Sequence, residues 1–154
     1  MGSSLKISKC RKVKTPTRGT VESAGIDFYV PEESFGHWPI TSARLNPGKS
    51  VNIPSGIKAK IPVGYALIAF NKSGMALKGL QVGACVVDSD YQGEIHLHVI
   101  NTTTEPIEIL VGQKLVQFIL IPYAHCNIIE IEEGSLYPEK TERGEGGFGS
   151  TNEK

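Results

Sequence analysis

A polar stretch near the C-terminus, residues 143–152, carries residue types that bind phosphates and a nucleobase. It holds Arg143, four glycines, Phe148, Ser150 and Thr151. Glycines let backbone N–H groups approach phosphate oxygens, a guanidinium donates two parallel hydrogen bonds, and an aromatic ring stacks on a base. A P-loop is excluded, because it needs a lysine immediately before the hydroxyl residue. The stretch predicts a lid over a nucleotide, and a disordered polar terminus is the alternative.

A second candidate is the segment 83–94, in which an apolar strand runs into an acidic turn. Asp88 directly follows Val86 and Val87, where partial burial would fix a carboxylate as a general base. An EF-hand is excluded, because Gln92 occupies a ligand position and Val99 stands where the closing glutamate is needed. Ordinary turn chemistry is the alternative.

Two shorter segments could contribute charge to the same site. Lys72, Ser73 and Gly74 place a cation, a hydroxyl and a glycine where a strand meets a short helix, and such junctions bind phosphate. A solvated loop with a capping serine explains the same residues. Asp27 is a carboxylate at the start of an apolar strand, and a structural, hydrogen-bonded role is its alternative.

Nucleophilic catalysis by a side chain is not indicated. The chain has no Gly-x-Ser-x-Gly elbow, and Cys85 has no adjacent histidine. Direct attack by water is therefore the expected chemistry.

The elements that must position these residues are mostly strands. Alternating or short apolar runs predict strands at residues 49–53, 57–61, 65–70, 94–101, 115–121 and 128–131. Turns containing Gly48, Gly56, Gly64 and Gly112 separate them. One short helix is expected at 73–78. The pattern predicts an all-β fold, a jelly roll or distorted β-barrel, over residues 1–138, followed by a mobile Gly-rich segment at 139–154.

The composition limits the possible partners. A chain of 154 residues with 16 basic and 16 acidic side chains fits one globular domain of zero net formal charge. Neither nucleic acid nor a membrane is expected as a partner, because no global basic footprint and no long apolar run are present. Three scattered cysteines, without a signal-peptide pattern, favour a reducing compartment: the cytoplasm, or the nucleus or host cytosol.

Five segments in this order resemble the five motifs of the trimeric dUTPase family. They are residues 24–27, 72–74, 86–93, 112–117 and 143–151, which together span nearly the whole chain. The third and fifth are specific individually, and the others gain meaning from the joint occurrence. The resemblance implies a jelly-roll subunit, a homotrimer with shared active sites, and hydrolysis of dUTP to dUMP and pyrophosphate, which keeps uracil out of DNA and supplies dUMP for thymidylate synthesis.

The resemblance also implies roles for individual residues. Asp88 would activate a water that attacks the α-phosphorus, and Asp27 would hold, through water, a Mg²⁺ chelated by the triphosphate. The hairpin with Cys85 and Val86 would hold uracil through its backbone, and Tyr91 would exclude a 2′-hydroxyl. The phosphates would be contacted by Lys72, Ser73, Gly74 and Gln117, with Arg143, Gly149 and Ser150 closing over them and Phe148 stacking on the base.

Three positions depart from the family pattern. Lys72 stands where arginine is usual, Cys85 where glycine is frequent, and Asn152 where the family ends on glycine. Lysine replaces a planar fork by a point charge, so we expect a weaker phosphate contact. These departures leave open a weakly catalytic, nucleotide-gated regulatory protein of the same fold, and a dCTP deaminase is the other alternative.

Overall fold

The structure is a computed structural model that describes residues 4–34 and 42–147. The chain divides into two compact units, residues 1–124 and residues 125–154. The predicted boundary at residue 138 stays a prediction. None of the described helices is long and apolar enough to cross a bilayer.

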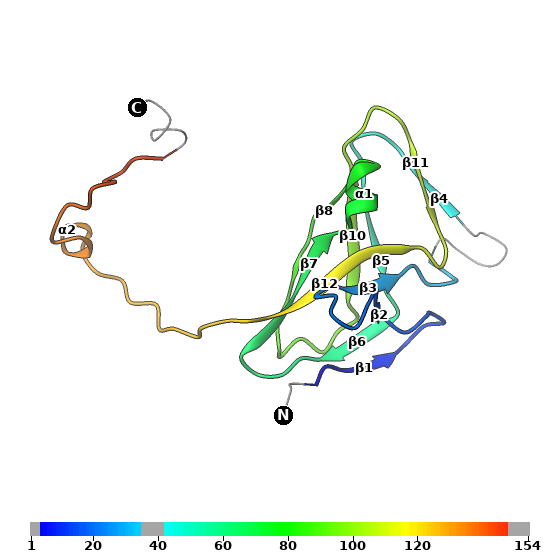
Figure 1. Ribbon diagram of the computed structural model, residues 1–154, viewed down its shortest axis with the longest axis horizontal. Coiled ribbons are helices and arrows are strands. Elements are labelled where there is room, and N and C mark those ends of the chain that lie inside the picture. Colours follow the sequence, from blue (N-terminus) through cyan, green and yellow to red (C-terminus); the bar gives the residue numbers. More distant parts are fainter. Residues whose placement is uncertain (1–3, 35–41, 148–154) are drawn as a thin grey trace. The chain divides into compact units, whose positions relative to one another are not determined.

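The first unit contains nearly all of the regular secondary structure, and the predicted all-β fold is confirmed (Figure 1). Its elements are β1 (Lys6–Lys9), β2 (Thr17–Arg18), β3 (Ile26–Tyr29), β4 (Ser42–Leu45), β5 (Ser50–Pro54), β6 (Ile57–Lys60), β7 (Tyr65–Asn71), α1 (Ser73–Leu77), β8 (Leu80–Val82), β9 (Val86–Val87), β10 (His96–Asn101), β11 (Ile107–Leu110) and β12 (Lys114–Pro122).

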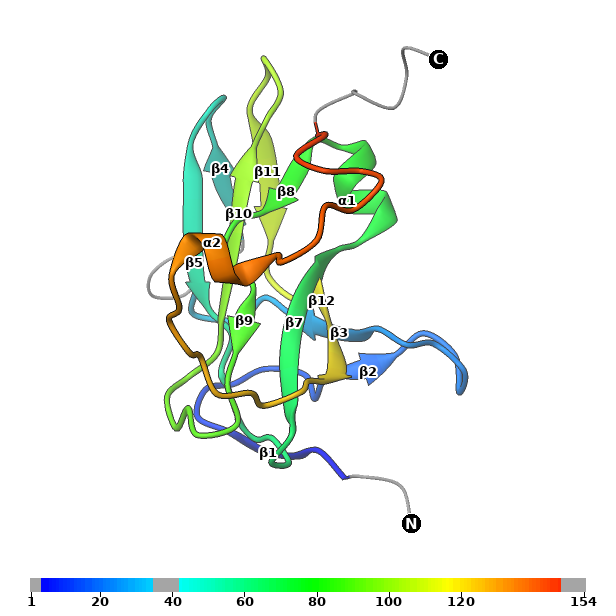
Figure 2. The same ribbon diagram turned by 90° about the vertical axis from the view of Figure 1, so that its left-hand side faces the viewer.

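The largest sheet is antiparallel, with the strand order β2-β3-β12-β7-β9. Its central strands, β12 and β7, pair from Val116 opposite Asn71 to Pro122 opposite Tyr65. Both are nearly continuous apolar runs, as expected for strands covered on both faces. Figures 1 and 2 both show α1 at the end of β7.

Three smaller sheets complete the unit: β5-β10-β8, β1-β6 and β11-β4. The inward side chains of β10 (Leu97, Val99) join Phe28 and Phe118, whose ring centroids lie 4.5 Å apart, in one buried cluster. Between the strands, Gly48, with φ of 67°, adopts the left-handed conformation expected of a turn glycine.

The second unit does not contain the predicted strand at residues 128–131. Its described part has one short helix, α2 (Glu133–Leu136), without a buried residue. The apolar side chains Ile128, Ile129 and Ile131 are 98%, 77% and 50% exposed. A strand needs a neighbour for its backbone hydrogen bonds, and this segment has no strand partner within the described chain. The alternating pattern alone was therefore insufficient.

Candidate active site

Three neighbouring strands bring the first, second and fourth motifs together. Gln117 on β12 lies directly opposite Asp27 on β3 and opposite Phe70 on β7. Lys72 follows the last residue of β7, and its ammonium reaches the Asp27 carboxylate. Asp27, Lys72 and Gln117, which are far apart in the sequence, therefore form one cluster near the C-terminal end of β7.

Asp27 is a buried carboxylate between two lysines. Its side chain is 8% exposed, with Oδ1 paired to Lys72 and Oδ2 lying 3.0 Å from Nζ of Lys114. Burial acts to raise the pKa of Asp27, but the two ammonium groups outweigh burial and hold the pKa below its ordinary value of 3.8. The carboxylate is therefore ionised and fixed at neutral pH.

Gln117 is positioned by backbone contacts on both sides. Its Nε2 donates to the carbonyl oxygen of Asn71 at 2.8 Å. On the other side it packs so close to Gly25 that a Cβ at that residue would lie 2.0 Å from Oε1 of Gln117. The glycine two residues before Asp27 thus provides the space that the amide occupies.

The start of α1 lies open beside this cluster. Ser73 and Gly74 are exposed, and a Cβ built on Gly74 would meet nothing within 4 Å. Lys72 occupies the N-cap position, and no side chain caps the helix. The Ser73 hydroxyl and the Gly74 backbone are therefore accessible beside the Lys72 ammonium and the Gln117 amide, an arrangement that suits an oligophosphate.

The third motif forms a different hollow, a cavity of about 180 Å³ beside β9. The cavity is lined by Ala84, Cys85, Val86, Val87, Asp88, Tyr91, Glu94, Ile95, His96 and Phe118. Tyr91 is fixed by its hydroxyl, which donates to the Glu94 carbonyl at 2.9 Å. The expected partial burial of Asp88 is wrong for this chain, because β9 is a two-residue edge strand and leaves the carboxylate exposed.

These two parts of the site do not meet within one chain. Val87 pairs with Leu67, so Asp88 lies level with Ala66, whereas Gln117 lies opposite Phe70. The two residues are therefore offset by four residues along the strand direction. They are also two strand spacings apart, from β9 across β7 to β12. Together these offsets separate their backbones by about 16 Å. A single α-phosphate cannot contact both groups of one chain.

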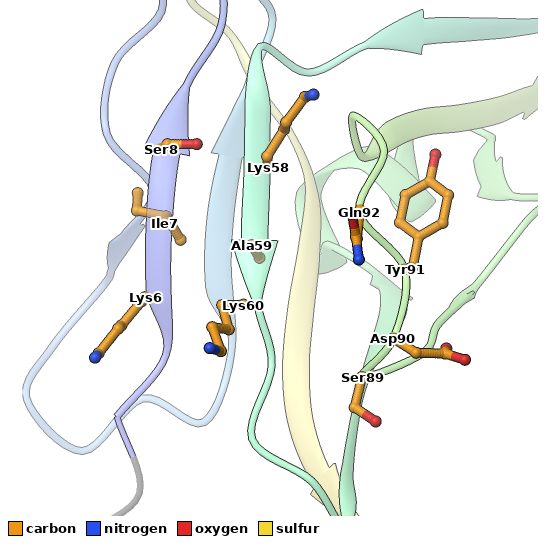
Figure 3. A pocket seen from close by; sticks show the side chains of 10 residues that line it. All are labelled: Lys6, Ile7, Ser8, Lys58, Ala59, Lys60, Ser89, Asp90, Tyr91 and Gln92. Atoms are coloured by element: carbon orange, nitrogen blue, oxygen red, sulfur yellow. The ribbon is translucent and has the colours of Figure 1, made fainter.

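A second hollow, of about 490 Å³, lies beyond Tyr91 (Figure 3). One wall is the loop 89–92, and the other is formed by β1 and β6. Lys6 and Lys60 lie directly opposite each other there, and Lys58 shares their wall. The sequence reasoning singled out none of these lysines.

The predicted lid residues lie in the second unit. Arg143 is exposed, and its Nε donates to the carbonyl oxygen of Gly146 at 2.9 Å. Phe148, Gly149 and Ser150 lie outside the described residues. The structure therefore leaves the lid as a prediction.

Comparison with known proteins decides the family. The dUTPase family profile matches residues 11–152. The chain belongs to the dUTPase family. A deoxyuridine 5′-triphosphate nucleotidohydrolase of Yarrowia lipolytica is 36% identical over 151 residues, covering 96% of this chain and 88% of that protein. One from Wolbachia pipientis is 35% identical over 149 residues, covering 95% and 92%.

Solved structures of phage dUTPases share the fold. A Staphylococcus bacteriophage 80alpha dUTPase mutant with dUpNHpp matches with a TM-score of 0.79 and 21% identity, covering 97% of this chain and 99% of that one. The dUTPase of phage phi11 matches with a TM-score of 0.72 and 19% identity, covering 88% and 100%.

Within this dUTPase, the residue that sequence reasoning missed is Lys114. It stands inside the fourth motif, yet only Gln117 was assigned a contact. In a regular strand, side chains three residues apart point to opposite faces. The register shifts between Lys114 and Val116, and this β-bulge lets Lys114 and Gln117 face Asp27 together. A pattern of residue types does not reveal such a bulge.

Proposed function

We infer that the chain hydrolyses dUTP to dUMP and pyrophosphate. Membership of the dUTPase family, over residues 11–152, supports this function, and so do the named relatives that align over most of their length. The observation that carries the inference is the joining of Asp27, Lys72 and Gln117 by three neighbouring strands. This cluster offers cationic and amide donors to a triphosphate.

In the proposed reaction, Asp88 accepts a proton from water as the water oxygen attacks the α-phosphorus. The bond between the α-phosphorus and the bridging oxygen breaks, and pyrophosphate leaves with that oxygen. The exposure of Asp88 and its place in the lining of the cavity beside β9 support this role, because such a carboxylate is accessible both to water and to a nucleotide in the cavity.

The cavity beside β9 is proposed to hold the nucleoside. Backbone groups at Cys85 and Val86 would pair with uracil and reject cytosine, whose donor pattern leaves buried groups unpaired. Tyr91, held by the Glu94 carbonyl, would leave no room for a 2′-hydroxyl. The presence of all three residues in the lining of this cavity supports the assignment.

The phosphates are proposed to bind at the cluster beside α1. Lys72, Ser73, Gly74 and Gln117 would donate to phosphate oxygens. The lid residues Arg143, Gly149 and Ser150 would close over them, and Phe148 would stack on uracil.

Magnesium is proposed to arrive with the triphosphate. Its chemistry would be to neutralise the charge that develops on the leaving pyrophosphate. Asp27 is only 8% exposed and its Oδ2 lies 3.0 Å from the Lys114 ammonium, which suits a carboxylate that receives a hydrogen bond from a metal-bound water better than one that ligates directly. Asp27 would thus orient the chelate through water.

A homotrimer with shared sites is part of the proposal. The separation of about 16 Å between the backbones of Asp88 and Gln117 supports it, because an α-phosphate that needs both groups would have to take them from different copies. The exposed Ile128, Ile129 and Ile131 support it as well, since apolar side chains gain by being covered. The proposed location is the cytoplasm, or the nucleus or host cytosol, where deoxynucleotide pools are used.

Subunit mixing tests the shared site. Asp88→Asn and Lys72→Met each abolish one part, and each variant alone is expected to be inactive. When the two are unfolded and refolded together, about a quarter of the sites in random trimers combine an intact Asp88 with an intact Lys72. Pyrophosphate release should therefore return in the mixture.

The same assay separates the alternatives. If mixing restores nothing although differently tagged chains of the two variants co-purify as trimers, the site is not shared between chains. If dCTP yields ammonia instead of pyrophosphate, the reaction class is wrong. Wild-type turnover as slow as that of Asp88→Asn would favour the regulatory alternative.

A further inference from the structure

Lys114 has no role in the proposed contacts to substrate, yet it shares Asp27 with Lys72. The two ammonium groups take one carboxylate oxygen each. Lys72 is the more buried of the two, with 23% of its side chain exposed against 42% for Lys114. Asp27 is therefore the common partner of one lysine assigned to the phosphates and one lysine that is not.

Lys114 is held in place independently of Lys72. Its Nζ lies 5.8 Å from the ring centroid of Tyr29, a cation–π distance. The Tyr29 hydroxyl in turn lies 2.6 Å from Oγ1 of Thr17 on β2. The β-bulge between Lys114 and Val116 sets Lys114 directly opposite Tyr29 on the Asp27 side of the sheet. Strand pairing and an aromatic ring thus fix this ammonium.

In the phosphate contacts described above, Lys72 would leave Asp27 for the triphosphate. A lysine carries a compact ammonium with three donors, whereas the five donors of an arginine fork can serve a carboxylate and a phosphate together. If Lys72 moves to the phosphates, Oδ1 of Asp27 loses its cation. A carboxylate that is 8% exposed would then depend on Lys114 alone.

We propose that Lys114 is a positioning residue that keeps Asp27 in place while Lys72 transfers from Asp27 to the triphosphate. The inference rests on the proposed roles of Asp27 and Lys72. Its consequence is that Lys114 supports binding of the magnesium chelate without touching the nucleotide. Because position 72 is a lysine in this chain, Asp27 needs a second cation when Lys72 leaves, and Lys114 is that fixed second cation.

The test compares Lys114→Met, Lys114→Arg and Lys12→Met. Lys12 is a matched control, because it pairs at 2.7 Å with Glu32 in an exposed ion pair outside the cluster. Isothermal titration measures the affinity for dUpNHpp with and without Mg²⁺. We expect Lys114→Met to weaken binding about 10- to 100-fold in magnesium, as loss of an outer-shell partner does, and to change it little in EDTA. Lys114→Arg should restore the affinity, and Lys12→Met should match the wild type.

The Asp27→Asn background shows whether Lys114 acts through Asp27. There, Lys114→Met should cause no further loss of affinity, and this double variant leaves no unpaired buried carboxylate if the single variant folds poorly. Equal magnesium-dependent affinity for folded Lys114→Met and wild type would overturn the inference, and so would equal losses in both backgrounds. If Asp27→Asn itself binds normally, the proposed role of Asp27 fails instead.

Discussion

Replacing Gly25 by alanine tests the phosphate cluster, because the added methyl group competes with Gln117 for the same space. The new Cβ would lie 2.0 Å from Oε1 and 2.9 Å from Cδ of Gln117. Both atoms belong to the far end of a flexible side chain, so the amide rotates away and the backbone stays. The hydrogen bond from Gln117 to the Asn71 carbonyl is then lost.

The expected effects on stability and on catalysis differ in size. Loss of one hydrogen bond costs about 0.5–1.5 kcal/mol, and the change from glycine to alanine returns about 0.4–1 kcal/mol by restricting the unfolded chain. The free energy of unfolding should therefore change by less than about 1 kcal/mol. A displaced amide also loses its hydrogen bond to a charged phosphate, about 1.5–3 kcal/mol, so kcat/KM should fall about 10- to 150-fold.

Gly48→Ala is the matched control. Gly48 has a φ of 67°, and a methyl group added there would meet nothing within 4 Å, so alanine suffers only backbone strain of about 1–2 kcal/mol, far from the cluster. Denaturant unfolding and steady-state pyrophosphate release are measured for both variants. Gly48→Ala should be the less stable of the two variants and keep full activity. Gly25→Ala should be the more stable of the two and have a lower kcat/KM. Unchanged kcat/KM in Gly25→Ala would refute the placement of Gln117 on the phosphates.

Two further predictions concern the lid and acid stability. Deleting residues 143–154 should greatly reduce turnover and leave the thermal unfolding of the first unit unchanged; full activity of the truncated protein would refute the lid. Burial acts to raise the pKa of Glu94. Hydrogen bonds from Arg11 and from the Gly56 N–H outweigh burial, so the pKa of Glu94 lies below its ordinary value of 4.5. Glu94→Gln should therefore destabilise the protein at neutral pH, and the difference from wild type should vanish as pH falls below 4.5 through the lower folded pKa. Unfolding curves at several pH values check this, with Glu32→Gln as the exposed control; a difference that persists in acid would contradict it.

Much of the fold follows from local pattern. The apolar runs that became β7 and β12 are long enough to mark buried strands, and the helix predicted at 73–78 is α1, Ser73–Leu77. Strands such as β1 (Lys6–Lys9) and β4 (Ser42–Leu45) were not predicted, because they are short and lack a clear apolar alternation. The prediction of a strand at 128–131 was wrong for the opposite reason. The segment has the apolar alternation of a strand but no neighbouring strand within the described chain.

By itself the sequence determined the chemistry of this protein. The sequence indicated a family and a reaction through the types and order of its motif residues, from Asp27 through Lys72, Asp88 and Gln117 to Arg143. Such motifs can be recognised without knowing which residues are in contact.

Only the tertiary structure decided which of these groups meet. Strand order placed Asp27, Lys72 and Gln117 together, and strand register kept Asp88 apart from them. The bulge in β12 brought Lys114 to Asp27, against the two-residue period that a sequence pattern assumes. Hydrogen bonding between distant strands sets register and bulges, so no local run of residues specifies them.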